Sequence, residues 1–278
     1  MPIGLLFAGA VAVEAIPCGQ IPGADAILND RAIRWIIVGE RHGTSEAPEI
    51  FGDLACLAAI RGRKPVVAVE FPVDATDAIR QFVTSPDEVA ARDQLLAHPF
   101  WHGPVHDGRS SRAMLTLFAR LRQWKRSDVI ADVVAFQPTT AVTGEAYEQA
   151  MAFNLERMSD GENLVVALVG NVHAQLKRRQ FSGGSYLPMA GYLPRSQTLS
   201  YNIGDNGGAQ WACFAEATEK SSMQCGSRDT GPAARKYERG FVHIGGQERA
   251  YSGYLNLGTV TTASEPALPD RDNHEPRK

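Results

Sequence analysis

The chain has 278 residues, of which 44% are hydrophobic and 21% are charged, and its formal net charge is −3. This length and apolar content are sufficient for a domain with a large buried core. The near-neutral charge and the lack of a basic stripe argue against binding to nucleic acid or to an anionic membrane surface. No apolar run reaches the length of a membrane span, so no integral membrane segment is expected.

Residues 1–17 are predicted to be a signal peptide or leader. An apolar run is followed there by small residues at Ala10–Ala12 and Val13–Ala15, which are typical of a cleavage site. The basic residues that normally precede such a run are missing, so a first strand is the alternative. Export predicts a periplasmic or secreted protein, and the alternative location is the cytoplasm.

The four cysteines are consistent with an exported protein. Cys213 and Cys225 flank a polar stretch, and this spacing predicts a disulfide that clips a loop. Cys18 and Cys56 either form a second pair, or Cys56 is buried on an apolar helix face. In a reducing compartment all four would be unpaired thiols.

The stretch from Trp35 to Glu46 predicts a buried strand, a tight turn and the start of a helix. Its first residues are continuously apolar, Gly39 interrupts them, and Glu40, His42 and Glu46 follow within a few positions. Strand, turn and helix in this order place the polar residues at the carboxyl end of a sheet strand, where open α/β folds bind ligands.

Two later strands end in the same way. Val66–Glu70 ends in a carboxylate, and Leu164–His173 ends in an imidazole. Asn171 lies beside that imidazole in the sequence and is expected to bind a ligand or to orient His173. A carboxylate that directly follows buried apolar residues is costly to bury without a partner. The alternative is a strand that simply emerges into solvent. We expect the three strand ends to converge on one polar cluster.

The remaining pattern fixes the expected fold class. Apolar stripes predict helices between these strands, the last from about Glu145 to Met158, and a further strand is predicted over Val129–Phe136. This alternation predicts an α/β protein, a three-layer α/β/α sandwich with a mostly parallel sheet. One domain is expected over 18–262. It becomes a β-rich C-terminal extension from about residue 182, with short strands at Ser196–Ile203, Ala209–Ala215, Gly240–Gly245 and Tyr251–Val260.

The chain ends in a predicted disordered tail. Residues 263–278 are rich in proline and charge and contain few apolar residues.

An unusual loop spans residues 98–109. It contains three of the seven histidines, including His102 and His106, but its prolines and Gly103 exclude a helix that would align them as metal ligands. We expect His102, His106 and Asp107 to contact a ligand, and Arg109 to stabilise an anionic intermediate. The alternative is a surface loop held by an Asp–Arg pair.

Imidazoles and carboxylates at strand ends are suited to two kinds of chemistry. His42, Glu70 and His173 could hold a divalent transition metal, or the same groups could carry out metal-free acid–base catalysis. The sequence contains no Gly-x-Ser-x-Gly elbow, Walker loop or His-Glu-x-x-His motif.

Four short motifs resemble the superfamily that joins erythromycin esterases, Tiki-type metalloproteases and ChaN-type haem-binding lipoproteins. They are Gly39–Glu46, Glu70 after its strand, Met151–Leu155 and Gly170–Ala174. Together they span roughly residues 33–180. The sequence departs from the esterase pattern at two places: Glu40 and His42 are one residue closer together, and Tyr147–Glu148 stands where esterases carry Arg-Asp.

The resemblance implies a hydrolase that acts on a small-molecule or peptide substrate. His42, or a metal, would activate water to attack an ester, lactone or amide in a pocket shaped by Glu40, Glu46, Glu70 and His173. The alternative within the same superfamily is a periplasmic haem- or iron-binding protein without catalysis. The sequence does not indicate an oligomeric state.

Overall fold

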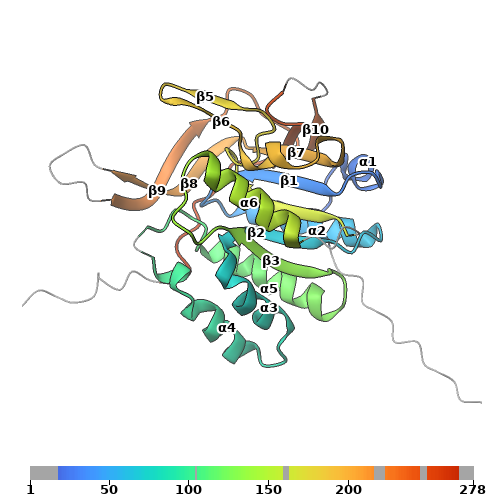
Figure 1. Ribbon diagram of the computed structural model, residues 1–278, viewed down its shortest axis with the longest axis vertical. Coiled ribbons are helices and arrows are strands. Elements are labelled where there is room, and N and C mark those ends of the chain that lie inside the picture. The colour runs from blue at the N-terminus through green and yellow to red at the C-terminus, as the bar shows by residue number, and fades with distance from the viewer. Residues whose placement is uncertain (1–17, 104, 159–162, 216–222, 245–248, 269–278) are drawn as a thin grey trace, which may run out of the picture.

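A seven-stranded sheet forms the middle layer of the protein, with strand order β10-β11-β7-β1-β4-β2-β3 (Figure 1). Neighbouring strands run parallel except at the β10–β11 pair. The strands are β1 (Trp35–Glu40), β2 (Val66–Pro72), β3 (Asp132–Gln137), β4 (Val165–Gly170), β7 (Thr198–Gly204), β10 (Gly240–His243) and β11 (Gly253–Asn256). Because β1, β4 and β2 run parallel, their carboxyl ends meet at one edge of the sheet.

The computed structural model describes residues 18–103, 105–158, 163–215, 223–244 and 249–268. The predicted leader, residues 1–17, lies outside these ranges.

Helices cover both faces of the sheet, as the continuous apolar runs of β1 and β4 require. Within β1, Ile36 and Val38 belong to the hydrophobic core on one face of the sheet. Trp35 and Ile37 belong to the core on the other face. The first side carries α1 (Ala24–Leu28), α2 (Glu46–Ile60), α3 (Thr76–Thr84), α4 (Glu88–Ala97) and α5 (Arg112–Arg126), and the second carries α6 (Glu145–Met158). The predicted three-layer α/β/α sandwich with a mostly parallel sheet is therefore confirmed. No helix within the described ranges is both long enough and apolar enough to cross a bilayer.

In the described part of the chain, four short 3₁₀ helices connect the larger elements. They are η1 (Val73–Ala75), η2 (Pro99–His102), η3 (Met189–Tyr192) and η4 (Arg195–Gln197).

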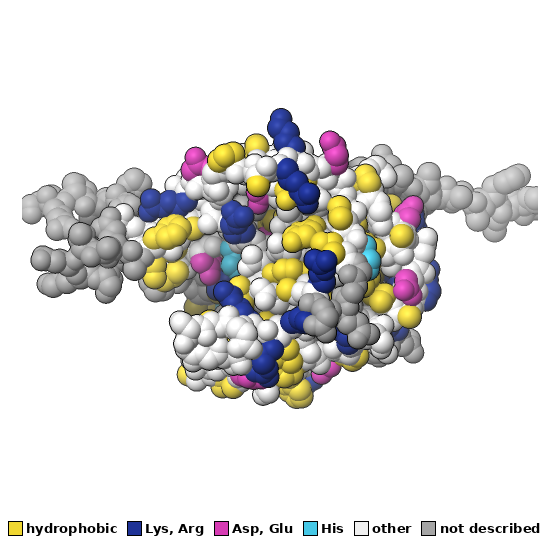
Figure 2. Space-filling view, turned by 90° about the horizontal axis from the view of Figure 1, so that it is seen from above, with side chains coloured by type: hydrophobic (Ala, Val, Ile, Leu, Met, Phe, Trp, Pro, Cys, Tyr) yellow, Lys and Arg dark blue, Asp and Glu magenta, His cyan; other side chains and the backbone are white. Residues whose placement is uncertain are grey.

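The second half of the chain differs in part from the predicted extension. Strands β7, β10 and β11 complete the main sheet, whereas two antiparallel hairpins lie outside it: β5 (Arg179–Phe181) with β6 (Gly184–Tyr186), and β8 (Gly207–Ala215) with β9 (Met223–Pro232). Strands β5, β6 and β9 were not expected, because they are mostly exposed and carry no apolar alternation. Figure 2 views the side of the molecule that carries β5, β6 and β10, where hydrophobic side chains lie mid-face with Lys and Arg side chains among them.

The predicted Cys213–Cys225 disulfide is present, and of the two alternatives for Cys18 and Cys56 the structure shows the second pair. Cys213 and Cys225 are directly opposite one another on β8 and β9, and Cys18 is bonded to Cys56 on α2. The first bridge thus joins two paired strands.

The prediction of a disordered tail from residue 263 is wrong for residues 263–268, and residues 269–278 lie outside the described ranges. The backbone of Ser264 donates to the Gly43 carbonyl at 2.8 Å, and that of Ala267 donates to the Ser110 carbonyl at 2.9 Å. Composition predicted disorder because the segment has few apolar side chains, but its backbone groups are satisfied by distant loops.

Candidate functional site

Glu40 and His42 form a hydrogen-bonded pair at the carboxyl end of β1. The distance from His42 Nδ1 to Glu40 Oε1 is 3.0 Å, and Glu40 is only 4% exposed. A carboxylate acceptor at Nδ1 fixes the proton there in the neutral imidazole, so that Nε2 can accept a proton. Gly43 follows with a φ of +81°, and its carbonyl accepts hydrogen bonds from the Trp211 and Ser264 amides. The turn that carries His42 is therefore held by two distant segments.

Glu70 lies at an irregularity in β2. The β2–β3 register shifts between Val69 and Pro72, so that β2 contains one residue more than β3 over this interval. Such bulges redirect a side chain next to functional sites. Glu70 Oε2 accepts the Gly170 amide at 2.6 Å, and Glu70 Oε1 accepts Arg109 Nη1 at 2.9 Å.

His173 forms a second histidine–carboxylate pair. It lies in the turn after β4, and its Nδ1 is 2.9 Å and 2.8 Å from the two oxygens of Glu148 on α6. Glu148 is 3% exposed and also accepts the Met189 amide at 2.8 Å. The remaining nitrogen of each imidazole faces the carboxylate of Glu70, with Nε2–O distances of 3.6 Å for His42 and 4.0 Å for His173.

Gly170 lies at the centre of this arrangement. A Cβ atom at this position would be 3.0 Å from His42 Nε2 and 3.4 Å from both Glu70 Oε2 and His173 Cδ2. The glycine leaves room between the two imidazoles, which any side chain would reduce. We call Glu40, His42, Glu70, Glu148 and His173, together with Arg109, the polar cluster.

Arg109 provides the fixed positive charge of the polar cluster. Asp107 receives hydrogen bonds from Arg109 Nε at 3.0 Å and Nη2 at 2.7 Å, and Gln137 Oε1 accepts from Nη1 at 2.9 Å. Tyr147 lies beside the cluster, with its ring centroid 5.9 Å from that of His173. Burial and the charge of Glu70 raise the pKa of Tyr147 to about 12, so the phenol stays protonated.

The charges of the polar cluster lower the pKa of Glu70 and raise the pKa of His42 and His173. Burial by itself would raise the pKa of Glu70, but His42, Arg109 and His173 lower it below its ordinary value. Burial by itself would lower the pKa of both imidazoles. The pKa of His42 is nevertheless raised by Glu70 and Glu40, and that of His173 by Glu148 and Glu70. Glu70 is thus an ionised carboxylate placed between two imidazoles that hold their protons more strongly than usual.

Glu40 has a different environment. Burial raises its pKa, although the hydrogen bond and charge of His42 oppose this shift. Its second oxygen, Oε2, is buried and has no hydrogen-bond partner in the described part of the chain. Glu40 and His42 therefore compete for one proton.

The structure brings most of the predicted site residues together, but not all of them. The three strand ends that carry Glu40, Glu70 and His173 do converge. Glu46 instead accepts hydrogen bonds from the Thr262 hydroxyl at 2.7 Å and the Thr262 amide at 2.9 Å. Asn171 joins the cluster through its backbone, since its amide donates to the Glu40 carbonyl at 2.8 Å.

The two loop histidines have other contacts. His102 is exposed, with Nε2 2.8 Å from the Leu96 carbonyl, and His106 Nδ1 lies 3.2 Å from the Ser110 hydroxyl. Neither contact is with the polar cluster. Asp107 and Arg109 do reach it, because Gly108, with a φ of +101°, packs directly against Gly43.

Glu148 is the residue that the sequence interpretation missed. It shares the buried side of α6 with Met151, Ala152 and Leu155. The sequence did contain a signal for it: Glu148 lies three residues before Met151, on the same side of the helix as the buried apolar residues. A carboxylate buried there requires a partner.

The polar cluster does not fit a divalent metal. Within the described ranges, no three His, Cys, Asp or Glu side chains are arranged to hold a metal ion. Of the predicted ligands, Glu70 is bonded to the Arg109 guanidinium, whose charge would repel a cation. A haem also fits poorly, because its axial ligand would have to face an apolar cavity, whereas charged side chains surround both imidazoles. We therefore derive no step through either group.

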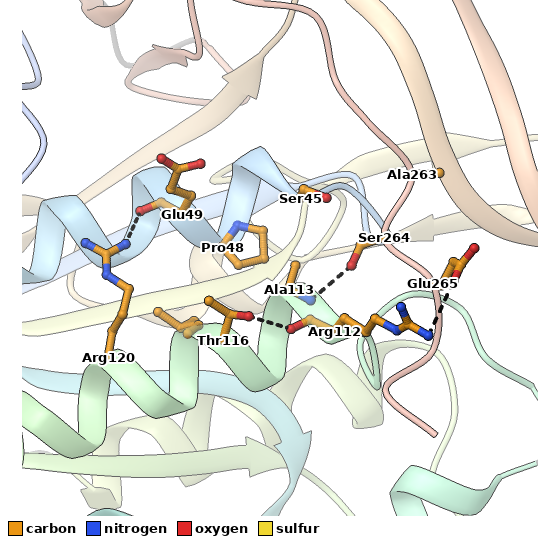
Figure 3. Close-up of a pocket in the computed structure, with 11 residues that line it drawn as sticks. Ser45, Pro48, Glu49, Arg112, Ala113, Thr116, Arg120, Ala263, Ser264 and Glu265 are labelled. Carbon is orange, nitrogen blue, oxygen red and sulfur yellow. Dashed lines mark hydrogen bonds and ion pairs between the residues drawn. The ribbon is translucent and has the colours of Figure 1, made fainter. Parts of the chain in front are cut away.

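A pocket of about 560 Å³ lies between α2, α5 and residues 263–265, with Ser45 at its lining (Figure 3). Both of its arginines are paired, Arg112 with Glu265 and Arg120 with Asp53. None of the polar cluster side chains lines it. The candidate site is therefore identified by the side chains of the polar cluster and not by this pocket.

Comparison with known proteins identifies the fold of the chain. No protein-family model and no curated protein matches the sequence. A mutant of the erythromycin esterase EreC in its open conformation has a TM-score of 0.62 and 10% identity, with 88% of this chain and 94% of that chain covered. A Bacillus cereus protein has a TM-score of 0.63 and 9% identity, with 88% and 93% covered. The protein therefore has an erythromycin esterase-like fold.

Proposed function

We propose that the protein is a hydrolase in which His42 activates water for attack on an ester, lactone or amide. The observation that carries this proposal is the Glu40–His42 pair, which holds a partly buried imidazole with Nε2 beside the space left by Gly170. A histidine oriented by a carboxylate is a common general base.

The polar cluster supplies a group for each step of such a reaction. His42 Nε2 takes a proton from water while the oxygen of that water bonds to the substrate carbonyl carbon. His173, whose raised pKa favours the protonated form, stabilises the negative charge that develops on the carbonyl oxygen. As the scissile bond breaks, the His42 imidazolium returns its proton to the leaving alkoxide or amine. Glu70 stabilises the imidazolium meanwhile, 3.6 Å from Nε2.

The esterase-like fold and the disulfides support the wider parts of the proposal. The fold is one in which an esterase is known, and the substrate is accordingly a small molecule or peptide with an ester, lactone or amide bond. Two disulfides favour an oxidising compartment, so we place the protein in the periplasm or outside the cell. The haem-binding alternative is not favoured, because charged groups surround both imidazoles.

The test is a hydrolysis screen with chromogenic esters, lactones and peptides. We expect turnover by the wild-type protein and a loss of about 10³-fold in kcat for His42→Ala, the range of general-base catalysis. His102→Ala is the matched control, because it removes a histidine outside the cluster and should retain activity within twofold or so. Full turnover by His42→Ala on a substrate that the wild type hydrolyses would overturn the proposal.

A further inference from the structure

Tyr147 brings a phenol group to the polar cluster. It lies in the first turn of α6, directly before Glu148, and its ring centroid is 5.9 Å from that of His173. The side chain of Tyr147 is partly exposed, as are both imidazoles of the cluster, whereas the three glutamates of the cluster are buried. A substrate bound at the cluster would therefore meet the two imidazoles and this phenol.

The side chain of Gln137 determines how the phenol of Tyr147 is bonded. Arg109 Nη1 donates to Gln137 Oε1 at 2.9 Å, and because a guanidinium can only donate, the amide oxygen of Gln137 faces Arg109. The NH₂ group of Gln137 is then the group that is available to the phenol, and the hydrogen bond between these side chains lowers the pKa of Tyr147. A hydrogen bond has this effect when it is donated to the phenol oxygen, because it stabilises the ionised form.

The phenol of Tyr147 therefore accepts a hydrogen bond and keeps its own proton for another partner. In the part of the chain that the structure describes, no acceptor is bonded to this proton. Two other phenols differ from it, since the Tyr192 hydroxyl donates to Glu145 at 2.7 Å and the Tyr251 hydroxyl donates to the Asn171 carbonyl at 2.7 Å. A fixed donor that faces the reaction site is suited to stabilise negative charge on a substrate oxygen.

The surroundings of the phenol keep it protonated at neutral pH. Burial and the charges of Glu70 and Glu148 raise the pKa of Tyr147, Arg109 and Gln137 lower it, and the resulting value is about 12. The phenol is thus a neutral donor beside His173, the group that stabilises the carbonyl oxygen in the proposed reaction.

We propose that Tyr147 is a catalytic residue, and that its phenol donates a hydrogen bond to the substrate carbonyl oxygen together with His173. As the water oxygen bonds to the carbonyl carbon and His42 takes the proton of that water, the carbonyl π electrons move onto the oxygen, which accepts from both donors. The phenol keeps its proton throughout. When the electrons return to the carbon–oxygen bond, the leaving group departs with the proton from His42. Such donors form an oxyanion hole, and this role of Tyr147 rests on the proposed hydrolysis.

The test compares Tyr147→Phe with the wild type on a nitrophenyl ester and an ethyl ester of the same acid. The variant keeps the ring and removes only the hydroxyl. We expect kcat to fall by about 10²-fold, the effect of removing one oxyanion-hole donor, and by the same factor on both esters, because they share the carbonyl oxygen. A loss confined to the ethyl ester would overturn the proposal, since the phenol would then protonate the poorer leaving group. Unchanged kcat on both esters would also overturn it.

Tyr192→Phe is the matched control. It removes a phenol whose proton is already bonded to Glu145, and it should retain kcat within twofold or so. Denaturant unfolding establishes that both variants are folded, and an equal loss of kcat in both would overturn the role of Tyr147. His42→Ala separates the two proposals: its full turnover would overturn the proposed hydrolysis, whereas full turnover by Tyr147→Phe alone would overturn only the oxyanion role.

A binding measurement tests the same role without turnover. The probe is ethyl methylphosphonate, whose charged tetrahedral group resembles the intermediate, and the measurement is isothermal titration calorimetry. Tyr147→Phe should bind it about tenfold more weakly than the wild type, and Tyr192→Phe should bind it as the wild type does. Equal affinities of the wild type and Tyr147→Phe, or no binding by the folded wild type, would overturn the proposal.

Discussion

The two histidine–carboxylate pairs of the polar cluster are alike in geometry but different in origin. Glu40 and His42 are two residues apart at the end of one strand, and their contact is 3.0 Å. Glu148 and His173 are 25 residues apart, on α6 and in the turn after β4, and their contacts are 2.8 and 2.9 Å. The first pair depends on one turn, whereas the second requires α6 to be correctly packed on the sheet.

The two pairs are also held in position by different parts of the chain. The Glu40–His42 pair is anchored through Gly43 by two backbone hydrogen bonds from β8 and the C-terminal segment. The Glu148 carboxylate is itself fixed by the Met189 amide, so that His173 is coupled to the segment that follows the β5–β6 hairpin. We therefore expect His42 to serve as the base and His173 as the group whose position responds to its surroundings.

Replacing each carboxylate by its amide should distinguish the two pairs most clearly. We expect Glu40→Gln to lower kcat by about 10²-fold, because the base loses its orientation, and Glu148→Gln to lower it by about tenfold. NMR titration should show a lower pKa for His42 in the first variant and for His173 in the second, since each loses a carboxylate that raises it. Equal effects of both variants on both imidazoles would contradict the separation of roles.

A methyl group at residue 170 should disturb both pairs at once. Gly170→Ala introduces a Cβ atom 3.0 Å from His42 Nε2, where it would occupy the space between the imidazoles. We expect kcat to fall by about tenfold, with a change in unfolding free energy of roughly 1 kcal/mol. Denaturant unfolding measures the stability. An unchanged kcat in the folded variant would show that this space is not used by substrate.

Activity should follow a bell-shaped dependence on pH. It rises as His42 becomes neutral and can accept a proton, and it falls as His173 loses the proton with which it stabilises the carbonyl oxygen. Since the pKa of His42 is raised, the half-maximal point of the rising limb should lie above 6.5. The measurement is kcat/KM against pH. A kcat/KM profile without a limb that rises with pH would exclude His42 as the base.

The free energy of unfolding should decrease as pH rises above neutrality. The raised pKa values of His42 and His173 contribute stability that is complete below 6.5 and is lost as pH rises through the folded values. The lowered pKa of Glu70 contributes stability that is complete above 4.5 and is lost as pH falls through the folded value. Stability from these groups should therefore be greatest between pH 4.5 and 6.5, and the raised pKa of Glu40 shifts the maximum toward the acid end. Urea unfolding at a series of pH values checks this maximum.

The smallest effect on activity is expected at Glu46. Glu46→Gln weakens its hydrogen bonds to Thr262 and should cost about 1 kcal/mol of unfolding free energy, while kcat stays within twofold or so. A large loss of kcat without loss of stability would return Glu46 to the list of catalytic residues.

The sheet and its helices were largely predictable because their signals are local. The apolar run of β1, the stripe of α5 and the bounds of α6 at Glu145–Met158 follow from the spacing of apolar residues. Strands β5, β6 and β9 were not predictable from apolar spacing, because they are mostly exposed. The segment 263–268 was not predictable either, because backbone hydrogen bonds to distant residues hold this part of the chain in place. Thr261, for example, exchanges hydrogen bonds with Gly207 and Ala209 on β8.

The sequence by itself determined the α/β class and the Glu40–His42 neighbourhood, because both depend on residues that are close in the chain. It also placed carboxylate and imidazole groups at strand ends, and parallel pairing brings such ends together. Only the tertiary structure decided which carboxylate orients His173, that Arg109 pairs with Glu70, and that Glu46 binds the C-terminal segment. These partners are separated by 25, 39 and 216 residues, and a contact over such distances is fixed by packing and not by local preference.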